Sequence, residues 1–198
     1  HVTEDGLVIQ VFIPTAAAVS VKLKTTGKTY EMDMEDETGF FAVRIPRKST
    51  AEYTLLVTYD NGTQQELHDP YSYGSQIGES VLKKFEAGVC YDIYEKLGAH
   101  VMEIDGVKGV HFAVWAPCAM RVSVVGDFNL WDGRRHQMEK LGESGVFELF
   151  IPGLGEGTVY KYEVKAANGD AMLKADPYGT YTELRPHNAS VVWDVNGY

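Results

Sequence analysis

The segment GDFNLWDG, residues 126–133, places Trp131 among Gly, Asp and Asn residues that favour turns. Tryptophan side chains are mostly shielded from water, so one at the tip of a loop indicates a flat apolar partner that stacks on the ring. That partner is either a ligand or another protein surface. A third interpretation is that the ring folds back on its own loop. Trp131 is therefore the first candidate binding residue.

The titratable residues show no catalytic arrangement. The chain has 28 Asp and Glu residues and 6 His residues. We expect the carboxylates in turns or at exposed strand positions such as Glu148 and Glu163, and the histidines lack the His-x-x-x-His spacing of a metal site. Ser123 lies within an expected strand rather than on a strained nucleophile turn. The sequence therefore predicts no catalytic residue, no metal site and no cofactor.

Composition excludes several classes of protein. The formal net charge is -10 and the 18 Lys and Arg residues are scattered, so we expect no nucleic-acid partner. Hydrophobic residues make up 44% of the chain, and the longest apolar stretches are strand-sized, which predicts a soluble globular protein with no membrane segment. Cys90 and Cys118 give no disulfide framework, and we interpret them as buried thiols of a cytoplasmic protein.

The chain repeats itself. The segment GLVIQVFIPTAAAVSV, from Gly6, aligns without a gap with GVHFAVWAPCAMRVSV, from Gly109. The match resumes where GFFAVRIP, from Gly39, meets GVFELFIP, from Gly145. A third match joins YTLLVTYDNGTQQELHDPY to YKYEVKAANGDAMLKADPY. We infer two copies of one module, over residues 1–74 and 106–198.

Each copy reads as short alternating strands separated by turns. Val110, Phe112 and Val114 would share one face of a strand, and Asn-Gly pairs at 61–62 and 168–169 are typical of hairpin turns. This pattern predicts an all-β protein made of two tandem immunoglobulin-like β-sandwiches.

Residues 75–105 form the expected linker between the copies. Ile77, Val81, Leu82 and Phe85 recur at helical spacing, and Gly88 is a plausible helix stop. The sequence therefore predicts a short, partly helical linker.

The motifs in combination resemble a known family. The segments GVHFAVWAP, VSVVGDFNLWDG, GVFELFIPGLGEGTVYKYEV and KADPYGTYTELRPHNASVVWD are similar, in order, to the glycogen-binding module of branching and debranching enzymes of the α-amylase superfamily. GVCYDIYEKLGAH, residues 88–100, resembles the segment that precedes this module in bacterial 1,4-α-glucan branching enzymes, and DPYSYG fits the end of their extra N-terminal module. The resemblance covers nearly the whole chain.

The resemblance implies a set of sugar-binding residues. Trp131 occupies the position that stacks on glucose, Lys161 and Asn188 match polar residues that hydrogen-bond hydroxyl groups, and Leu184 corresponds to an apolar residue that inserts against the glucan. The alternatives without a sugar-binding role are that Lys161 is a solvated strand residue and that Asn188 only forms a turn. Trp115 and Trp193 are more simply explained by core or interdomain packing.

One departure from the family concerns the second stacking residue. Sugar-binding versions of the module carry another tryptophan after the hairpin glycine, where this chain has Ala171. A single stacking residue implies weak binding. The first copy has KLKTTGKTYEM in place of the Trp131 loop, so we expect no comparable site there.

The resemblance implies the non-catalytic N-terminal portion of a glycogen branching enzyme, which positions a catalytic (β/α)8 barrel and contacts α-1,4-glucan. Such enzymes transfer α-1,4-linked chains to 6-hydroxyl groups in glycogen biosynthesis without a cofactor. Nothing in this sequence reads as a barrel of alternating strands and helices. The alternatives are a stand-alone glycogen-binding adaptor resembling a kinase β subunit, and the N-terminal region of an isoamylase-type debranching enzyme.

Overall fold

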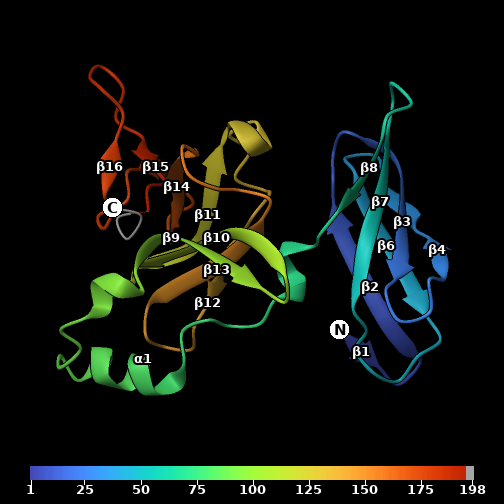
Figure 1. Ribbon diagram of the computed structural model, residues 1–198, viewed down its shortest axis with the longest axis horizontal. Coiled ribbons are helices and arrows are strands. Elements are labelled where there is room, and N and C mark those ends of the chain that lie inside the picture. Colours follow the sequence, from blue (N-terminus) through green and yellow to red (C-terminus); the bar gives the residue numbers. More distant parts are fainter. Residues whose placement is uncertain (195–198) are drawn as a thin grey trace. The chain divides into compact units, whose positions relative to one another are not determined.

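The protein forms two compact units. A computed structural model describes residues 1–194, and the chain divides between Ser72 and Tyr73. Each unit is a sandwich of antiparallel sheets, so the predicted all-β fold class is confirmed (Figure 1). The last residues of the predicted second module, 195–198, lie outside the described residues.

The first unit pairs a sheet of order β1-β2-β6-β5 with a sheet of order β4-β3-β7-β8. Its core is formed by alternate residues of the facing strands, including Val19, Val21, Phe41 and Val57. Its elements are β1 (Val2–Thr3), β2 (Gly6–Phe12), β3 (Ala16–Leu23), β4 (Thr29–Glu31), β5 (Asp33–Asp36), β6 (Phe40–Ile45), β7 (Tyr53–Tyr59), β8 (Gln64–Leu67) and η1 (Pro70–Ser72).

The second unit pairs a sheet of order β12-β13-β10-β9 with a sheet of order β11-β14-β17-β16, in which β15 also pairs with β14. Its strands are β9 (Gly98–Ile104), β10 (Val107–Trp115), β11 (Ala119–Gly126), β12 (Glu139–Lys140), β13 (Val146–Pro152), β14 (Val159–Ala166), β15 (Ala171–Lys174), β16 (Tyr181–Thr182) and β17 (Ser190–Val191). Its helical segments are α1 (Glu79–Glu86), η2 (Ile93–Glu95) and η3 (Asp127–Asn129).

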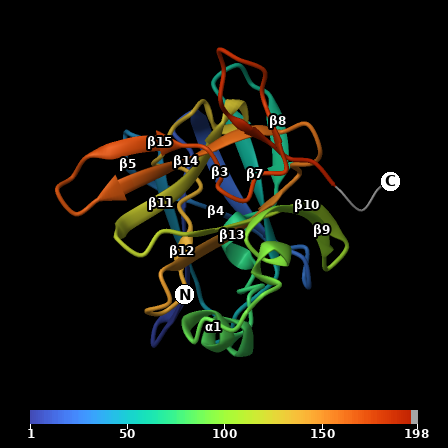
Figure 2. The ribbon, with the colours of Figure 1, turned by 90° about the vertical axis from the view of Figure 1, so that its left-hand side faces the viewer.

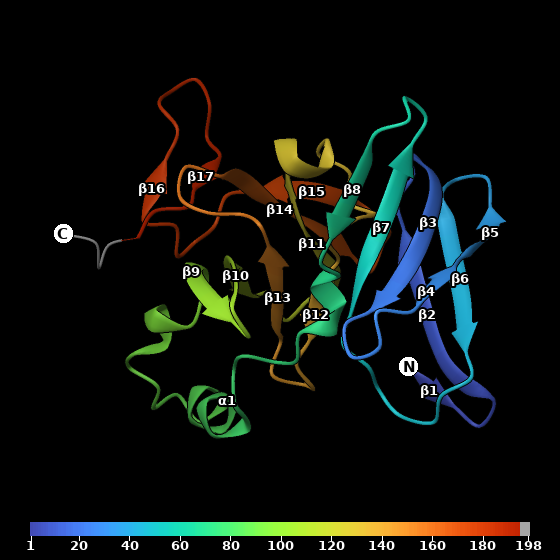
Figure 3. The same ribbon diagram turned by 45° about the vertical axis from the view of Figure 1, so that its right-hand side comes forward.

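Strand β10 is buried on both faces. Phe112 packs in the core between the two sheets, whereas Ala113 faces a second apolar cluster that includes Ile77 and Leu97. Phe85 of α1 packs against this second cluster, so α1 and its flanking segments cover the outer face of the β12-β13-β10-β9 sheet (Figure 3). None of the described helices is both long and apolar enough to cross a membrane.

Each unit contains a close approach between a glycine and a proline of the same unit, and the repeat alignment pairs the two glycines. Gly39 has a φ of +100°, and a Cβ atom there would lie 2.3 Å from the Cα atom of Pro14. Gly145 has a φ of +76°, and a Cβ atom there would lie 2.8 Å from the Cα atom of Pro117. Only glycine fits this approach of two backbone segments without displacement. The shared geometry explains why a Gly and a Pro recur in both copies of the sequence.

The segment predicted as a linker differs in part from the expectation. Its helix ends at Glu86 and Gly88 follows with a φ of +71°, as the glycine stop indicated. Residues 98–104, which we placed in the linker, form β9 and pair with β10 along its length. The module boundaries of the sequence analysis stay a prediction.

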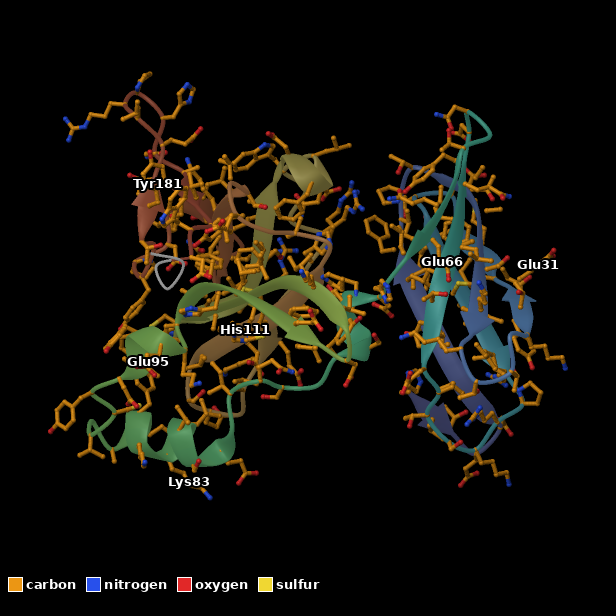
Figure 4. All side chains as sticks on the ribbon, in the orientation of Figure 1. Glu31, Glu66, Lys83, Glu95, His111 and Tyr181 are labelled. Atoms are coloured by element: carbon orange, nitrogen blue, oxygen red, sulfur yellow. The ribbon has the colours of Figure 1, made fainter. Side chains whose placement is uncertain are left out.

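The predicted burial of both cysteines was wrong, and the structure does not place Trp115 or Trp193 in the core. Cys118 is exposed and Cys90 is only partly buried. Trp115 is 51% exposed: its ring stacks edge-on against Phe85 at 5.9 Å, and its Nε1–H donates to the Ser144 carbonyl at 3.2 Å. Trp193 is also exposed and lies against the ring of Tyr181, a residue of β16 (Figure 4). A strand edge that meets only a linker or one neighbouring ring leaves part of a large side chain in water.

Candidate functional site

The candidate site lies on the outer face of the β11-β14-β17-β16 sheet. Tyr160 and Tyr162 of β14 are buried in the core between the sheets. Because successive strand residues point to opposite faces, Lys161 and Glu163 point outward. The neighbouring strands β11 and β15 extend this face on either side of β14 (Figure 2).

The loop of residues 127–138 folds over this face and is organised by Asn129. The Asn129 side chain is fully buried and accepts the Gly126 N–H at 3.0 Å. Its amide nitrogen donates to the Val124 carbonyl at 2.8 Å and lies 3.0 Å from Nδ1 of His136. One side chain therefore ties the start of the loop to its end.

His136 completes this network as an acceptor. Because the Asn129 amide nitrogen can only donate, Nδ1 of His136 must accept, which requires the neutral imidazole. Burial, with a smaller effect from the charge of Arg135, lowers the pKa of His136 to about 4. The ring also packs edge-on against Phe128 at 5.4 Å. Geometry and electrostatics thus agree on an uncharged His136 at neutral pH.

Trp131 is held in a defined pose within the loop. Its backbone N–H donates to the Gly126 carbonyl at 2.9 Å, and its indole Nε1–H donates to Oδ1 of Asp127 at 2.7 Å. The residue has a φ of +58°, a conformation that side-chain-bearing residues seldom adopt. The residue is partly buried, and the Asp127 bond holds the indole to its own loop, as one of the three interpretations of the sequence expected.

Lys161 and Asn188 are brought together by the fold. The ammonium group of Lys161 donates to Oδ1 of Asn188 at 2.5 Å, although the two residues come from β14 and from the loop that precedes β17. Val125 of β11 pairs directly with Lys161, and Gly126 beside it accepts the Trp131 N–H. Lys161 thus lies between the Trp131 loop and Asn188.

Leu184 lies in the same loop as Asn188. The loop is closed by the Glu183 N–H, which donates to the Ala189 carbonyl at 3.0 Å, and Leu184 is 84% exposed. β11 ends at Gly126 and β17 begins at Ser190, and both residues pair with Tyr160 of β14. The roles of Trp131, Lys161, Leu184 and Asn188 in binding stay a prediction.

The position of the family's second tryptophan offers no aromatic ring. Ala171 begins β15, is exposed and pairs with Lys165.

Glu163 of β14 is not the exposed residue that the alternation of the strand predicted. Glu163 forms an ion pair with Arg121, and Gly133 packs so closely over its carboxylate that a Cβ atom there would lie 2.0 Å from Oε1.

Glu148 is likewise not exposed, and the prediction for this residue was wrong. Its side chain is 4% exposed on the outer face of β13, where residues 75–77 cover it. Oε2 lies 2.8 Å from Nε2 of His111, and the carboxylate accepts the backbone N–H groups of Gln76 and Ile77. Glu148 therefore fastens the linker to the sandwich rather than serving as a catalytic acid.

The sequence analysis missed Asn129, His136 and Leu130. Asn129 read only as a turn residue, and His136 read as one of several dispersed histidines. Within residues 1–194, no cluster of three or more His, Cys, Asp or Glu side chains could hold a metal ion.

Comparison with family models decides between the alternatives. Residues 96–179 match the model described as carbohydrate-binding module 48, the isoamylase N-terminal domain. Residues 1–71 match the N-terminal domain of the alpha-1,4-glucan branching enzyme GlgB. The chain belongs to the glycogen branching enzyme family. It carries the N-terminal domain and the carbohydrate-binding module of these enzymes, in that order.

Curated relatives agree with this assignment. The chain is 47% identical over 196 residues to the 1,4-alpha-glucan branching enzyme of Paramagnetospirillum magneticum, covering 98% of this chain and 26% of that enzyme. It is 47% identical over 199 residues to the branching enzyme of Synechocystis, covering 100% of this chain and 26% of that enzyme. The chain thus spans about a quarter of the length of these relatives.

Among solved structures, the pullulanase of Klebsiella pneumoniae resembles the chain with a TM-score of 0.44 and 15% identity, over 98% of this chain and 21% of that one.

Proposed function

We propose that this chain is the non-catalytic N-terminal portion of a glycogen branching enzyme and that its second unit binds α-1,4-glucan on the outer face of the β11-β14-β17-β16 sheet. The observation that carries the site is the Lys161–Asn188 hydrogen bond beside the Trp131 loop. It joins two chain segments far apart in sequence into one polar pair, and the strand that leads into the Trp131 loop pairs with Lys161.

This arrangement fits the chemistry of a glucose chain. The flat C–H face of a glucose ring packs on the indole of Trp131, which Asp127 already holds in place. The ammonium group of Lys161 donates to ring hydroxyls, while Asn188 both donates and accepts. Leu184 adds an apolar contact from the other loop. Of the four side chains only Lys161 is charged, and such a mainly apolar and uncharged set suits a neutral ligand that carries many hydroxyl groups.

For the whole protein we propose transfer of α-1,4-linked chains to 6-hydroxyl groups, with catalysis in the region of the relatives that this chain does not span. The two sandwiches would position that catalytic barrel and help to hold the glucan. We further propose a cytoplasmic location, no nucleic-acid or membrane partner, and no cofactor. The branching-enzyme match over residues 1–71 favours this function over a stand-alone adaptor.

Migration in a native gel that contains glycogen tests the binding function. We expect the wild-type chain to be retarded and Trp131→Ala to lose about tenfold in affinity, which corresponds to about 1.4 kcal/mol for one stacked ring. Tyr91→Ala is a matched control, because this largely exposed aromatic residue lies outside the site. Equal retardation of wild type and Trp131→Ala would contradict the proposed role of the ring.

A second assay tests the absence of catalysis. The purified chain should form no α-1,6 branches on amylose, measured by the change in the iodine absorption spectrum. Branching by this chain alone would overturn the non-catalytic assignment.

A further inference from the structure

The outermost apolar side chain of the Trp131 loop belongs to Leu130. Leu130 is 72% exposed, whereas Trp131 is partly buried and its indole is bonded to Asp127. The family resemblance assigns roles to Trp131, Lys161, Leu184 and Asn188 but none to Leu130. A leucine this exposed gains little from burial in the folded chain.

Leu130 also has a strained backbone. Its φ and ψ are +58° and +30°, the left-handed conformation that glycine adopts freely and leucine does not. Strained residues of this kind cluster at ligand-binding segments, where the surrounding structure enforces them. Here the Leu130 N–H donates to the Asp127 carbonyl at 3.2 Å, and the buried Asn129 holds the preceding turn. A glycine would satisfy the backbone better, so the side chain itself calls for an explanation.

Leu184 is the counterpart of Leu130 on the opposite side of β14. Tyr160 pairs with Gly126 of β11 on one side and with Ser190 of β17 on the other. The Leu130 loop begins at the first of these strands and the Leu184 loop ends at the second. Since neighbouring strands are about 4.8 Å apart, the bases of the two loops are separated by about 10 Å. Lys161 of β14 lies between them and donates a hydrogen bond to Asn188 of the Leu184 loop.

We propose that Leu130 is a further glucan-contacting residue and that Leu130 and Leu184 form two apolar walls on either side of Lys161. This proposal rests on the proposed glucan-binding function. Leu130 directly precedes Trp131, so its side chain extends the contact surface beyond the glucose ring that stacks on the indole. The residue therefore favours longer α-1,4-glucan chains over short ones.

Leu130→Gly and Leu130→Ala test this proposal by titration with maltotriose and with maltoheptaose, followed by calorimetry. We expect both variants to bind maltoheptaose about fivefold more weakly and to lose less affinity for maltotriose. Leu130→Gly should keep or raise the midpoint of thermal unfolding, because glycine relieves the left-handed strain. Met120→Ala is the matched control, an exposed apolar residue at the opposite end of β11.

The outcomes separate the two proposals. If the wild type binds maltoheptaose and the Leu130 variants bind it equally well, the role of Leu130 is overturned while the site stands. Weaker binding together with a lower thermal midpoint in Leu130→Gly would assign Leu130 a purely structural role and would also overturn the proposal. If the wild type binds neither sugar, the proposed function itself fails.

Discussion

Glu148→Ala is expected to lower the free energy of unfolding of the second unit by about 3 kcal/mol or more, because each buried polar group that loses its partner costs about 1–3 kcal/mol. The change leaves His111 and the backbone N–H groups of Gln76 and Ile77 without their acceptor in a buried place. Chemical denaturation followed by tryptophan fluorescence measures the effect. Trp115, Trp131 and Trp193 are the 3 tryptophans of the sequence, and all lie in the second unit, so the signal reports this unit alone.

Glu143→Ala is the control for this experiment. The Glu143 side chain is 99% exposed, and its carboxylate forms a surface ion pair with Lys140 at 3.9 Å. Surface pairs of this kind contribute about 0–1 kcal/mol. A loss of stability in Glu148→Ala no larger than in Glu143→Ala would contradict the anchoring role of the buried carboxylate.

The pH dependence gives a second check on Glu148. Burial opposes ionisation of this carboxyl, but the hydrogen bonds from His111 and Ser75 outweigh it and hold its pKa below the usual range. A lowered folded-state pKa contributes stability above the unfolded-state value, and this contribution is lost as the pH falls through the folded-state value. The difference between wild type and Glu148→Ala should therefore shrink as the solution is acidified.

Asp176→Ala is expected to lower the free energy of unfolding of the same unit by about 3 kcal/mol or more, since buried groups that lose a partner cost about 1–3 kcal/mol each. The carboxylate accepts the hydroxyl groups of Tyr160 and Tyr162, at 2.6 Å and 3.0 Å, and the Tyr178 N–H at 2.8 Å. Both tyrosines are buried in the core, so the variant removes the carboxylate that their hydroxyl groups bond in the wild type.

The pH dependence of this second variant runs in the opposite direction. Burial raises the pKa of Asp176, although the hydrogen bond from Tyr160 acts against it. Stability from a raised folded-state pKa is present below the unfolded-state value and is lost as the pH rises through the folded-state value. The gap between wild type and Asp176→Ala should widen on acidification. Asp170→Ala, in an exposed turn, is the control, and a gap that narrows would refute the stated cause.

The alternation of apolar residues was enough to predict the two sandwiches, because strands that face a core must repeat every second residue. The same rule failed for Glu148. It assumes that the outer face of a sheet meets water, whereas residues 75–77 and α1 cover the outer face here. Whether a segment distant in sequence packs over the outer face of a strand depends on the tertiary fold. The alternation of residues within the strand does not predict it.

The candidate site was predictable in part. A tryptophan among turn residues pointed to the 127–138 loop, and the family motif pointed to Lys161 and Asn188. The contact between those two residues depends on the pairing of β14 with β17, which no local pattern encodes. The left-handed conformation of Leu130 and the burial of Asn129 arise from the path of the whole loop, so neither could be read from residue type.

The most direct test of the account is the fluorescence of Trp131 during titration with maltoheptaose. In a Trp115→Phe, Trp193→Phe double variant, Trp131 is the one remaining tryptophan of the sequence. Both replaced residues are exposed, and phenylalanine keeps their ring contacts with Phe85 and Tyr181 while it removes the indole hydrogen bond from Trp115 to the Ser144 carbonyl. We expect a saturable change in Trp131 emission, and we expect weaker binding when Lys161→Ala is added. An emission spectrum that stays constant, while the chain still binds glycogen, would place the glucan elsewhere and contradict it.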